Sequence, residues 1–337
     1  MKCILKYYLQ KFPNIFKSCN FKENFILFDY KFTNIFNSYG VNLGDFIQSI
    51  AVKNILLKLY PNINIILCDR DSLTVYKGKP AFTIMQGWFA HDNKFVPNNK
   101  IIPIFIGTHI TIEMQKYLSK FISDNSEYFK NKIIGCRDKN TLEYFKKQNI
   151  NSYLSRCLTL TFPKRIISPN QNKVFIVNIP EKLQSYIPQD LFENAEIINQ
   201  RFVDKGLKKT YYLKNSKKYF NQAEQLLNKY RDEARLVITT ALHCAAPCTA
   251  MGIPVVLISE TINNIRFSTL DGIIKIYSID DLKQGNINYS VQAPNIEDLK
   301  TLMIKNVDLT IKQVFDASVS DEYLCDIREK IENYKII

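Results

Sequence analysis

Three polar side chains that could carry acid–base or anion-binding chemistry each follow a short apolar run of the chain. They are His109, Arg137 and His243. An imidazole can accept or donate a proton near neutral pH. A guanidinium group forms paired hydrogen bonds with a carboxylate or a phosphate. Their placement after strands in both halves of the chain suggests a cleft that binds an anion, and a purely structural pair of Arg137 with Asp138 is the alternative interpretation.

The segment Leu236–Ile258 around His243 predicts a strand, a tight turn, a short helix and a second strand. Because proline is tolerated in the first turn of a helix, Pro247 predicts a helix that begins close to His243. The imidazole would then lie at the carboxyl end of a parallel strand, where open α/β sheets bind ligands. The helix dipole there favours anions and a neutral imidazole. A buried core or capping histidine is the alternative interpretation.

Alternating apolar strands and amphipathic helices must position these side chains. The expected strands are Phe25–Tyr30, Ile63–Cys68, Ala81–Gln86, Ile101–Ile106, Ile133–Ile134, Tyr153–Leu160, Lys173–Asn178, Ala195–Phe202, Leu236–Ile238, Pro254–Ile258 and Ile273–Tyr277. The expected helices are Gly44–Tyr60, Glu113–Lys130, Asn140–Gln148, Glu181–Tyr186, Lys217–Glu233, Ile296–Ala317 and Asp321–Tyr334. The alternation predicts an α/β fold of two doubly wound, Rossmann-like domains that face a central cleft. Residues 1–165 and 166–337 would form them, joined by the proline-containing linker 162–172.

Three further polar or aromatic residues stand at predicted element ends, and each has two interpretations. Asp45 either caps the helix that follows it or belongs to an anion site at that turn. Trp88 is either a core anchor or a side chain that stacks on a ligand. Asp138 either caps the next helix or holds Arg137 in place.

A net charge of +13 over 337 residues predicts attraction to an anionic partner. A lysine-rich coding bias is the alternative explanation. The densest basic run contains Lys205, Lys208, Lys209, Lys214, Lys217 and Lys218. This run lacks the pattern of an RNA-recognition sheet or a helix-turn-helix, so we do not expect nucleic acid as a partner.

The eight cysteines are scattered and none forms a C-x-x-C pair, and with three histidines they do not form a zinc-like cluster. We expect most of them to be small buried hydrophobes in a reducing compartment. No apolar run reaches the ~20 residues needed to cross a bilayer. The protein is therefore expected in the cytoplasm, with the inner face of the membrane as a peripheral location. These residues require no metal and no cofactor.

Five motifs, taken in chain order, resemble those of the polysaccharide pyruvyl transferase family. They are Asn42–Ser49, Gly87–Phe89, Gly135–Asp138 with Thr141, Cys157–Thr161, and Leu242–Cys248 running into Gly252–Val255. Each motif is short, but the ordered set spans most of the chain. The resemblance implies a glycosyltransferase-B-like fold and transfer of a pyruvyl group from phosphoenolpyruvate to a sugar hydroxyl of a polysaccharide or lipid-linked glycan.

The resemblance also implies roles for individual residues. His243 would be the general acid or base, Arg137 would hold the carboxylate or phosphate of the donor, and His109 would be a second polar residue of the donor site. The matched motifs add Asp45, Gln48, Trp88, Asp138 and Leu242 as substrate-binding residues. The partners implied are an anionic small-molecule donor and a glycan acceptor, while the oligomeric state stays open.

One position departs from the family pattern. Ala241 stands two residues before the histidine, where the family has an arginine. Alanine offers no hydrogen-bond donor to an anion, so Arg156 or Arg201 would have to take over that role. The alternatives are a glycosyltransferase that uses a nucleotide sugar and a glycan-binding relative without catalysis.

Overall fold

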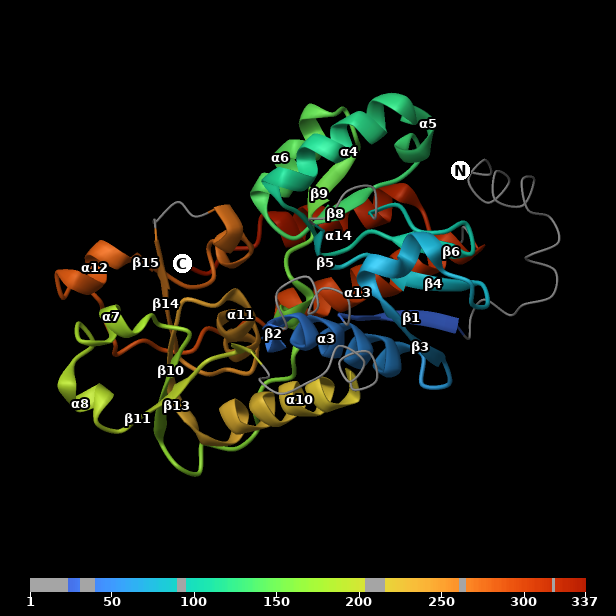
Figure 1. Ribbon diagram of the computed structural model, residues 1–337. Coiled ribbons are helices and arrows are strands. Elements are labelled where there is room, and N and C mark those ends of the chain that lie inside the picture. Colours follow the sequence, from blue (N-terminus) through green and yellow to red (C-terminus); the bar gives the residue numbers. More distant parts are fainter. Residues whose placement is uncertain (1–23, 31–39, 90–94, 204–215, 261–264, 317–318) are drawn as a thin grey trace. The chain divides into compact units, whose positions relative to one another are not determined.

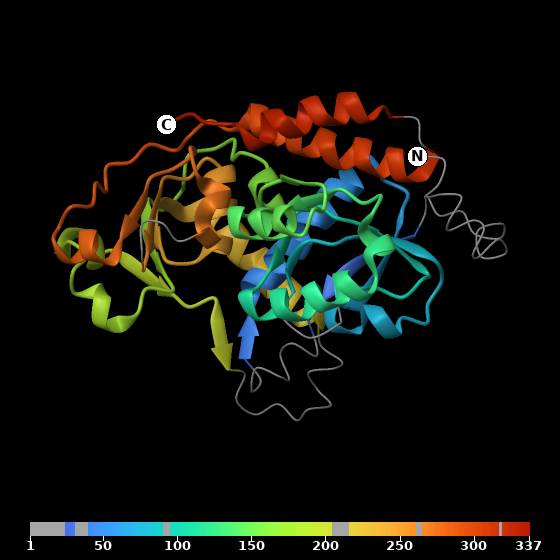
Figure 2. The same ribbon diagram turned by 90° about the horizontal axis from the view of Figure 1, so that it is seen from above.

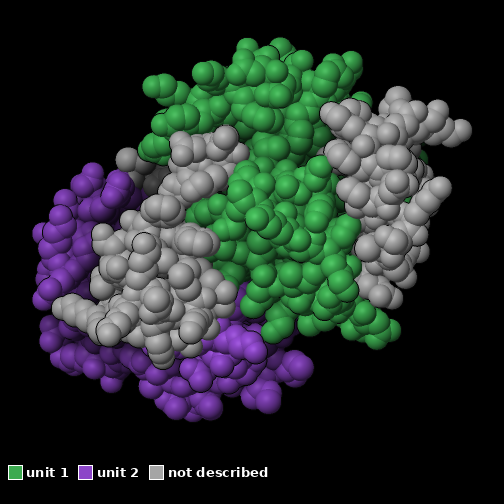
Figure 3. Space-filling view, turned by 45° about the vertical axis from the view of Figure 1, so that its right-hand side comes forward, with its two compact units in different colours: residues 1–30, 52–158, 298–334 green, residues 31–51, 159–297, 335–337 purple. Residues whose placement is uncertain are grey.

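The computed structural model describes residues 24–30, 40–89, 95–203, 216–260, 265–316 and 319–337 (Figure 1). The amino-terminal residues 1–23 and the part of the basic run from Lys205 to Lys214 lie outside this part of the chain. Two compact units are present (Figure 3). The first unit contains residues 1–30, 52–158 and 298–334, and the second unit contains residues 31–51, 159–297 and 335–337. None of the described helices is long and apolar enough to span a membrane.

The second unit is built on a parallel sheet of five strands in the order β11-β10-β13-β14-β15. Their bounds are Lys173–Val177 for β10, Ala195–Ile198 for β11, Ala234–Thr239 for β13, Val255–Ser259 for β14 and Ile276–Ser278 for β15. The first strand in the chain, β10, lies between β11 and β13, so the strand order reverses between β10 and β13. In parallel sheets the loops at such a reversal diverge and leave a crevice at the carboxyl ends of the strands.

Helices cover both faces of this sheet, which explains why its strands are apolar almost without interruption. On one face, Val174, Ile176, Leu236 and Ile238 pack with residues of α7, α8 and α12. Those short helices span Glu181–Gln184, Gln189–Phe192 and Ile279–Lys283. On the other face lie α10, Ser216–Glu233, and α11, Leu242–Ala250 (Figure 1). There Phe175 meets Tyr230 with 5.5 Å between ring centroids.

The first unit contains two parallel sheets of four strands, in the orders β3-β1-β4-β6 and β5-β7-β8-β9. Their bounds are Asn24–Asp29 for β1, Asn64–Asp69 for β3, Ala81–Ile84 for β4, Gly87–Phe89 for β5, Ile101–Ile104 for β6, Thr108–Ile110 for β7, Ile134–Cys136 for β8 and Ser152–Leu154 for β9. The 3-10 helix η2 covers Arg70–Val75 after β3. The predicted α/β class is confirmed.

Helices of the first unit include α4, Ile112–Asp124, α5, Ser126–Phe129, and α6, Lys139–Lys147. The long α13, Glu297–Asp316, and α14, Asp321–Glu332, lie side by side (Figure 2). Arg328 of α14 holds the pair together, because its Nη2 donates to the Thr310 hydroxyl at 3.1 Å and its Nε donates to Asn306 Oδ1 at 3.3 Å.

Helix α3, Leu43–Leu59, begins in the second unit and continues into the first. Its start is fixed by a short antiparallel pair, β2, Gly40–Asn42, with β12, Arg201–Val203, in which Asn42 faces Arg201. The Asn42 side chain accepts a hydrogen bond from the Gly44 N–H at 3.1 Å, as a helix cap does.

Three predicted elements were wrong in extent. Segment 113–130 is two helices, because Asn125 between them is non-helical with φ −139° and ψ 52°. Segment 153–160 is a strand up to Leu154, after which Arg156 takes φ 62° and the chain forms the 3-10 helix η4, Leu158–Thr161. Segment 195–202 contributes to two different sheets, as β11 and β12.

Candidate functional site

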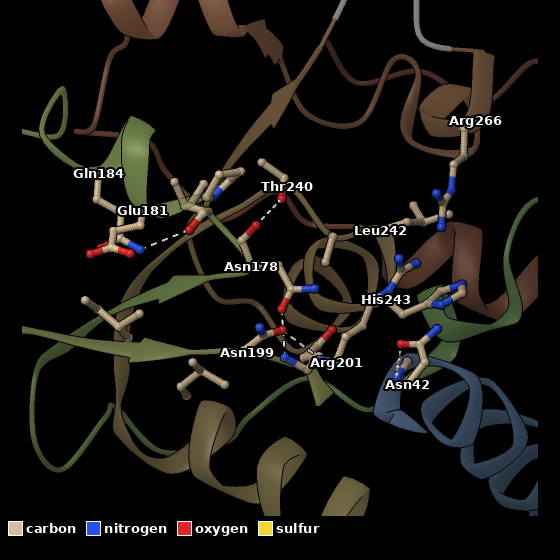
Figure 4. A pocket seen from close by; sticks show the side chains of 17 residues that line it. Asn42, Asn178, Glu181, Gln184, Asn199, Arg201, Thr240, Leu242, His243 and Arg266 are labelled. Atoms are coloured by element: carbon tan, nitrogen blue, oxygen red, sulfur yellow. Dashed lines mark hydrogen bonds between the residues drawn. The ribbon is translucent and has the colours of Figure 1, made fainter. Parts of the chain in front are cut away.

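A cavity of about 570 Å³ lies in the second unit at the carboxyl ends of β10 and β13 (Figure 4). It is lined by Asn42, Gly44, Asn178, Ile179, Pro180, Glu181, Gln184, Ile197, Ile198, Asn199, Gln200, Arg201, Thr240, Ala241, Leu242, His243 and Arg266. This is the crevice that the reversal of strand order between β10 and β13 predicts. Its volume falls in the range of small-molecule sites.

One end of the cavity is cationic. His243 comes from α11, Arg201 from β12, and Arg266 from the 3-10 helix η5, Ile265–Leu270. Figure 4 shows all three side chains on the side of the cavity that also holds Asn42. The imidazole is 5% exposed, whereas both arginines are exposed. We name this set, His243, Arg201 and Arg266, the cationic end.

The local sequence explains why His243 sits at the rim of the sheet. Strand β13 ends at Thr239, whose hydroxyl accepts a hydrogen bond from the Ala241 N–H at 2.9 Å. Ala241 is extended, with φ −104° and ψ 123°, and α11 begins at the next residue. The predicted placement of His243 between strand end and helix start is therefore confirmed.

The predicted position of Pro247 in the first turn was wrong, because Pro247 lies inside α11. A proline inside a helix lacks the N–H that would bond to the carbonyl four residues earlier, and its ring crowds that carbonyl. Here that carbonyl belongs to His243, and His243 is the residue of α11 with non-helical angles, φ −84° and ψ 15°. The proline thus places a kink at the histidine.

The start of α3 approaches His243 closely, and Gly44 makes this possible. A Cβ atom on Gly44 would lie 3.0 Å from the His243 Cβ and 3.1 Å from its Nδ1. Distances this short require the neighbouring atoms to shift. Two helix starts, those of α3 and α11, therefore lie beside the imidazole, and the positive ends of their dipoles favour an anion there.

The other end of the cavity carries amides and a carboxylate. Figure 4 shows Glu181 and Gln184 on the side away from His243, with Asn178 and Thr240 between the two ends. Asn178 has a positive φ of 56° and is held by three hydrogen bonds. The Thr240 hydroxyl donates to its carbonyl at 2.7 Å, and the Gln200 N–H donates to its side-chain oxygen at 2.7 Å. The Asn178 N–H donates to the Ile198 carbonyl at 2.9 Å.

A second polar cluster lies in the first unit and contains His109, Asp138 and Arg137. The His109 Nδ1 is 2.5 Å from Asp138 Oδ2, and the Arg137 Nε is 3.5 Å from the same oxygen. The Asp138 side chain is fully buried. It also caps α6, because it accepts hydrogen bonds from the Thr141 N–H and hydroxyl, each at 3.0 Å. Asp138 therefore has both of the structural roles that the sequence indicates.

The pKa of Asp138 is lowered from its ordinary value. Burial alone would raise it, but the charge of His109, a hydrogen bond from His109, the charge of Arg137 and the Thr141 N–H together outweigh the burial. The carboxylate is thus held in its ionised form inside this cluster.

His109 and Trp88 lie within strands, not at strand ends as the sequence indicated. His109 is the middle residue of β7, and Trp88 is its neighbour in β5 across the parallel pair. The guanidinium of Arg70 covers the Trp88 ring, 4.3 Å from its centroid. The aromatic surface of Trp88 is therefore already in contact with a side chain of the first unit.

Arg156 is engaged by the backbone of the first unit. Its side chain is buried, and its guanidinium donates to the carbonyls of Ile331 at 3.0 Å and Tyr334 at 2.8 Å. These contacts stabilise the carboxyl end of α14, where a cation is favourable. Arg156 thus has a structural role, whereas Arg201 lines the same cavity as Ala241.

The second unit brings together His243, Leu242 and Arg201 around one cavity. Asp45 and Gln48 are buried in α3 without lining it, and Gln48 Nε2 donates to Asp45 Oδ1 at 3.4 Å. The first unit groups His109, Arg137 and Asp138. A cleft shared by these groups stays a prediction.

Several residues of the cavity were not selected from the sequence. They are Asn178, Glu181, Gln184, Asn199, Thr240 and Arg266. Asn178 and Thr240 directly follow strands β10 and β13, so their place at strand ends could have indicated them. No comparable signal points to Arg266, because it lies several residues beyond the end of β14.

Among the described residues no cysteine forms a disulfide, and no group of three or more histidine, cysteine or acidic side chains could hold a metal ion. A search of curated proteins and a search of solved structures found no match to the chain. The family model described as polysaccharide pyruvyl transferase matches residues 42–261, a range that includes every cavity residue except Arg266. With the match covering well over half of its length, the chain belongs to the polysaccharide pyruvyl transferase family.

Proposed function

We propose that the protein transfers a pyruvyl group from phosphoenolpyruvate to a sugar hydroxyl of a polysaccharide or a lipid-linked glycan. The observation that carries the proposal is the cationic end of the cavity, where His243, Arg201 and Arg266 meet the starts of α3 and α11. Phosphoenolpyruvate carries a phosphate and a carboxylate, which are the groups that guanidinium side chains and helix starts bind.

The chemistry requires a proton donor and acceptor next to the bound anion. In this proposal His243 protonates the methylene carbon of the donor, which leaves the adjacent carbon electrophilic. A sugar hydroxyl oxygen bonds to that carbon, and the carbon–oxygen bond to phosphate breaks, with the electron pair leaving on phosphate. A second hydroxyl of the same sugar then completes the ketal. The two hydroxyl groups release two protons. One returns to His243 and replaces the proton that it gave to the methylene carbon, and the other leaves with phosphate.

In this proposal Arg201 and Arg266 supply the guanidinium groups that position 241 lacks. Ala241 lines the cavity at the position where the family has an arginine, and its methyl group cannot bind an anion. Arg201 and Arg266 line the same cavity from other elements and supply guanidinium groups there. We therefore propose that the donor is held by Arg201 and Arg266, with preset charges supplying much of the stabilisation of the transition state.

We further propose that both units are doubly wound, Rossmann-like domains of the glycosyltransferase-B kind. Support comes from the strand orders, since β10 in the second unit and β1 in the first each have later strands added on both sides. The first-unit cluster of His109, Arg137 and Asp138 would take part in substrate binding.

The test is phosphate release from phosphoenolpyruvate in the presence of glycan acceptors, preceded by thermal-shift screening of donors. A ligand bound by the native state raises the melting temperature. We expect a shift with phosphoenolpyruvate and none with UDP, GDP or CMP sugars. Shifts with a nucleotide sugar alone would instead support a glycosyltransferase, the alternative that the large cavity favours.

A further inference from the structure

The cavity is larger than the proposed donor requires. Phosphoenolpyruvate has about ten non-hydrogen atoms, and even at the ~30 Å³ that each water molecule occupies in the liquid these would fill roughly 300 Å³. The cavity measures about 570 Å³. A donor bound at the cationic end therefore leaves space for a second chemical group at the far end.

Glu181 and Gln184 line the side of the cavity away from His243, and Asn178 and Asn199 line it nearer the middle (Figure 4); we name these four residues the amide end. The side-chain oxygens of Asn178 and Asn199 accept backbone hydrogen bonds from Gln200 at 2.7 Å and Arg201 at 2.9 Å. Their amide nitrogens are thus the groups that can donate to a ligand. Neither asparagine brings a charge to this end.

The remaining two side chains of the amide end supply acceptors. Gln184 donates from Nε2 to the Ile179 carbonyl at 3.0 Å, which leaves its Oε1 as the group that can accept from a ligand. Glu181 is exposed and adds a carboxylate. Donors and acceptors that line the same cavity suit hydroxyl groups, because each hydroxyl both donates and accepts. A second phosphate at this end would instead be repelled by the negative charge of the Glu181 carboxylate.

We propose that the amide end of this cavity binds the vicinal hydroxyls of a sugar ring. Ile179, Pro180 and Ile197 line the same cavity and offer apolar contact to the carbon–hydrogen faces of such a ring. The assignment of that sugar as the acceptor rests on the proposed function, since the pyruvyl group would then be transferred within one cavity. A pyranoside and the ribose of a nucleotide share this chemistry, and the experiment separates them.

The experiment measures binding to the full chain by calorimetry with three probes. These are phosphoenolpyruvate, a panel of methyl pyranosides with their deoxy analogues, and UDP. Glu181→Gln should weaken binding of the sugar probe about tenfold or more, as expected for a lost hydrogen bond to a charged group. Binding of phosphoenolpyruvate should stay within about twofold. Binding of UDP that competes with the pyranosides and is lost in Glu181→Gln identifies ribose as the natural source of the hydroxyls.

Two further variants keep the result interpretable. Glu143→Gln makes the same charge change at an exposed position on α6 in the first unit and should leave every affinity unchanged. Gln184→Met removes the second acceptor at similar side-chain length and should weaken the sugar probe as well. Sugar binding that is unchanged in both Glu181→Gln and Gln184→Met overturns the amide-end proposal, even if phosphoenolpyruvate binds. Failure of the wild type to bind phosphoenolpyruvate, with sugar binding that depends on Glu181, overturns the proposed donor instead.

Discussion

His109 and His243 place the same side chain in opposite electrostatic surroundings. His109 lies inside a strand of the first unit and contacts the buried carboxylate of Asp138 at 2.5 Å. His243 lies at a helix start of the second unit, in a cavity that also holds two arginines. The carboxylate of Asp138 fixes the orientation of the His109 ring, whereas His243 lines a cavity in which a bound ligand would lie next to its imidazole. On the proposed function, His243 is therefore the candidate for proton transfer, while His109 is held in place by Asp138.

The largest expected effect is on turnover at His243. His243→Gln should reduce phosphate release by about 10² to 10⁴, the usual loss when a general acid or base is removed. His109→Gln is the matched variant in the first unit and should cost less. Steady-state assays with phosphoenolpyruvate and a glycan acceptor compare the two. Equal losses of turnover in His243→Gln and His109→Gln would contradict the proposal that only His243 transfers a proton.

Asp138→Asn tests the contact of His109 with Asp138 in the first unit through its effect on the stability of the protein. Removing one partner from a buried charged cluster should lower the free energy of unfolding by on the order of 3 kcal/mol at pH 7. Because the pKa of Asp138 is lowered in the folded state, its contribution is present above the unfolded pKa, near 4, and is lost as pH falls through the folded value. Urea unfolding of wild type and variant should therefore converge in acid.

The control for that measurement is Asp326→Asn. Asp326 is about half exposed and pairs with Lys330 at 2.7 Å on the surface of α14. Such exposed ion pairs contribute little to stability, so the free energy of unfolding of the Asp326→Asn variant should differ from that of the wild type by less than about 1 kcal/mol. A drop as large as that of Asp138→Asn would show that loss of any carboxylate, buried or not, explains the result.

Ala241→Arg tests how strongly the cavity around His243 in the second unit binds an anion. An added guanidinium at the rim of the cavity should raise affinity for phosphoenolpyruvate about tenfold through charge-assisted hydrogen bonds. Ala241→Met is the neutral control, since it adds length without charge. Titration calorimetry of both variants is the measurement. An unchanged affinity in Ala241→Arg would mean that Arg201 and Arg266 already satisfy the anion.

Gly44→Ala should have the smallest effect and act on geometry alone. Alanine favours a helix by about 1 kcal/mol over glycine, which offsets the crowding of its Cβ against His243. We expect a melting temperature close to that of the wild type and a turnover reduced by about threefold to tenfold, because small displacements of a reacting group are costly. Full activity in Gly44→Ala would show that the imidazole tolerates movement.

The sequence predicted the strands well where they are buried on both faces, as for β10, β13 and β14. It also predicted that His243 follows a parallel strand, because a run of β-branched residues and a turn are visible locally. Pairing between distant segments was not visible. Residues 195–202 look like one strand, yet Arg201 pairs with Asn42 in a different sheet, and that pairing brings Arg201 to the cavity. Arg156 was a candidate to replace the arginine missing at position 241, although it binds backbone carbonyls.

The pairing of β2 with β12 has a consequence for dissecting the protein. Asn42 and Gly44 line the cavity, although they lie far along the chain from every other residue that does. A fragment of residues 166–337 would retain the five-stranded sheet, His243 and both arginines. It would lack the start of α3 and the partner strand of Arg201. We expect such a fragment to keep more of its affinity for sugar probes at the amide end than for anions at the cationic end. Truncation would then distinguish the contributions of the two ends to binding.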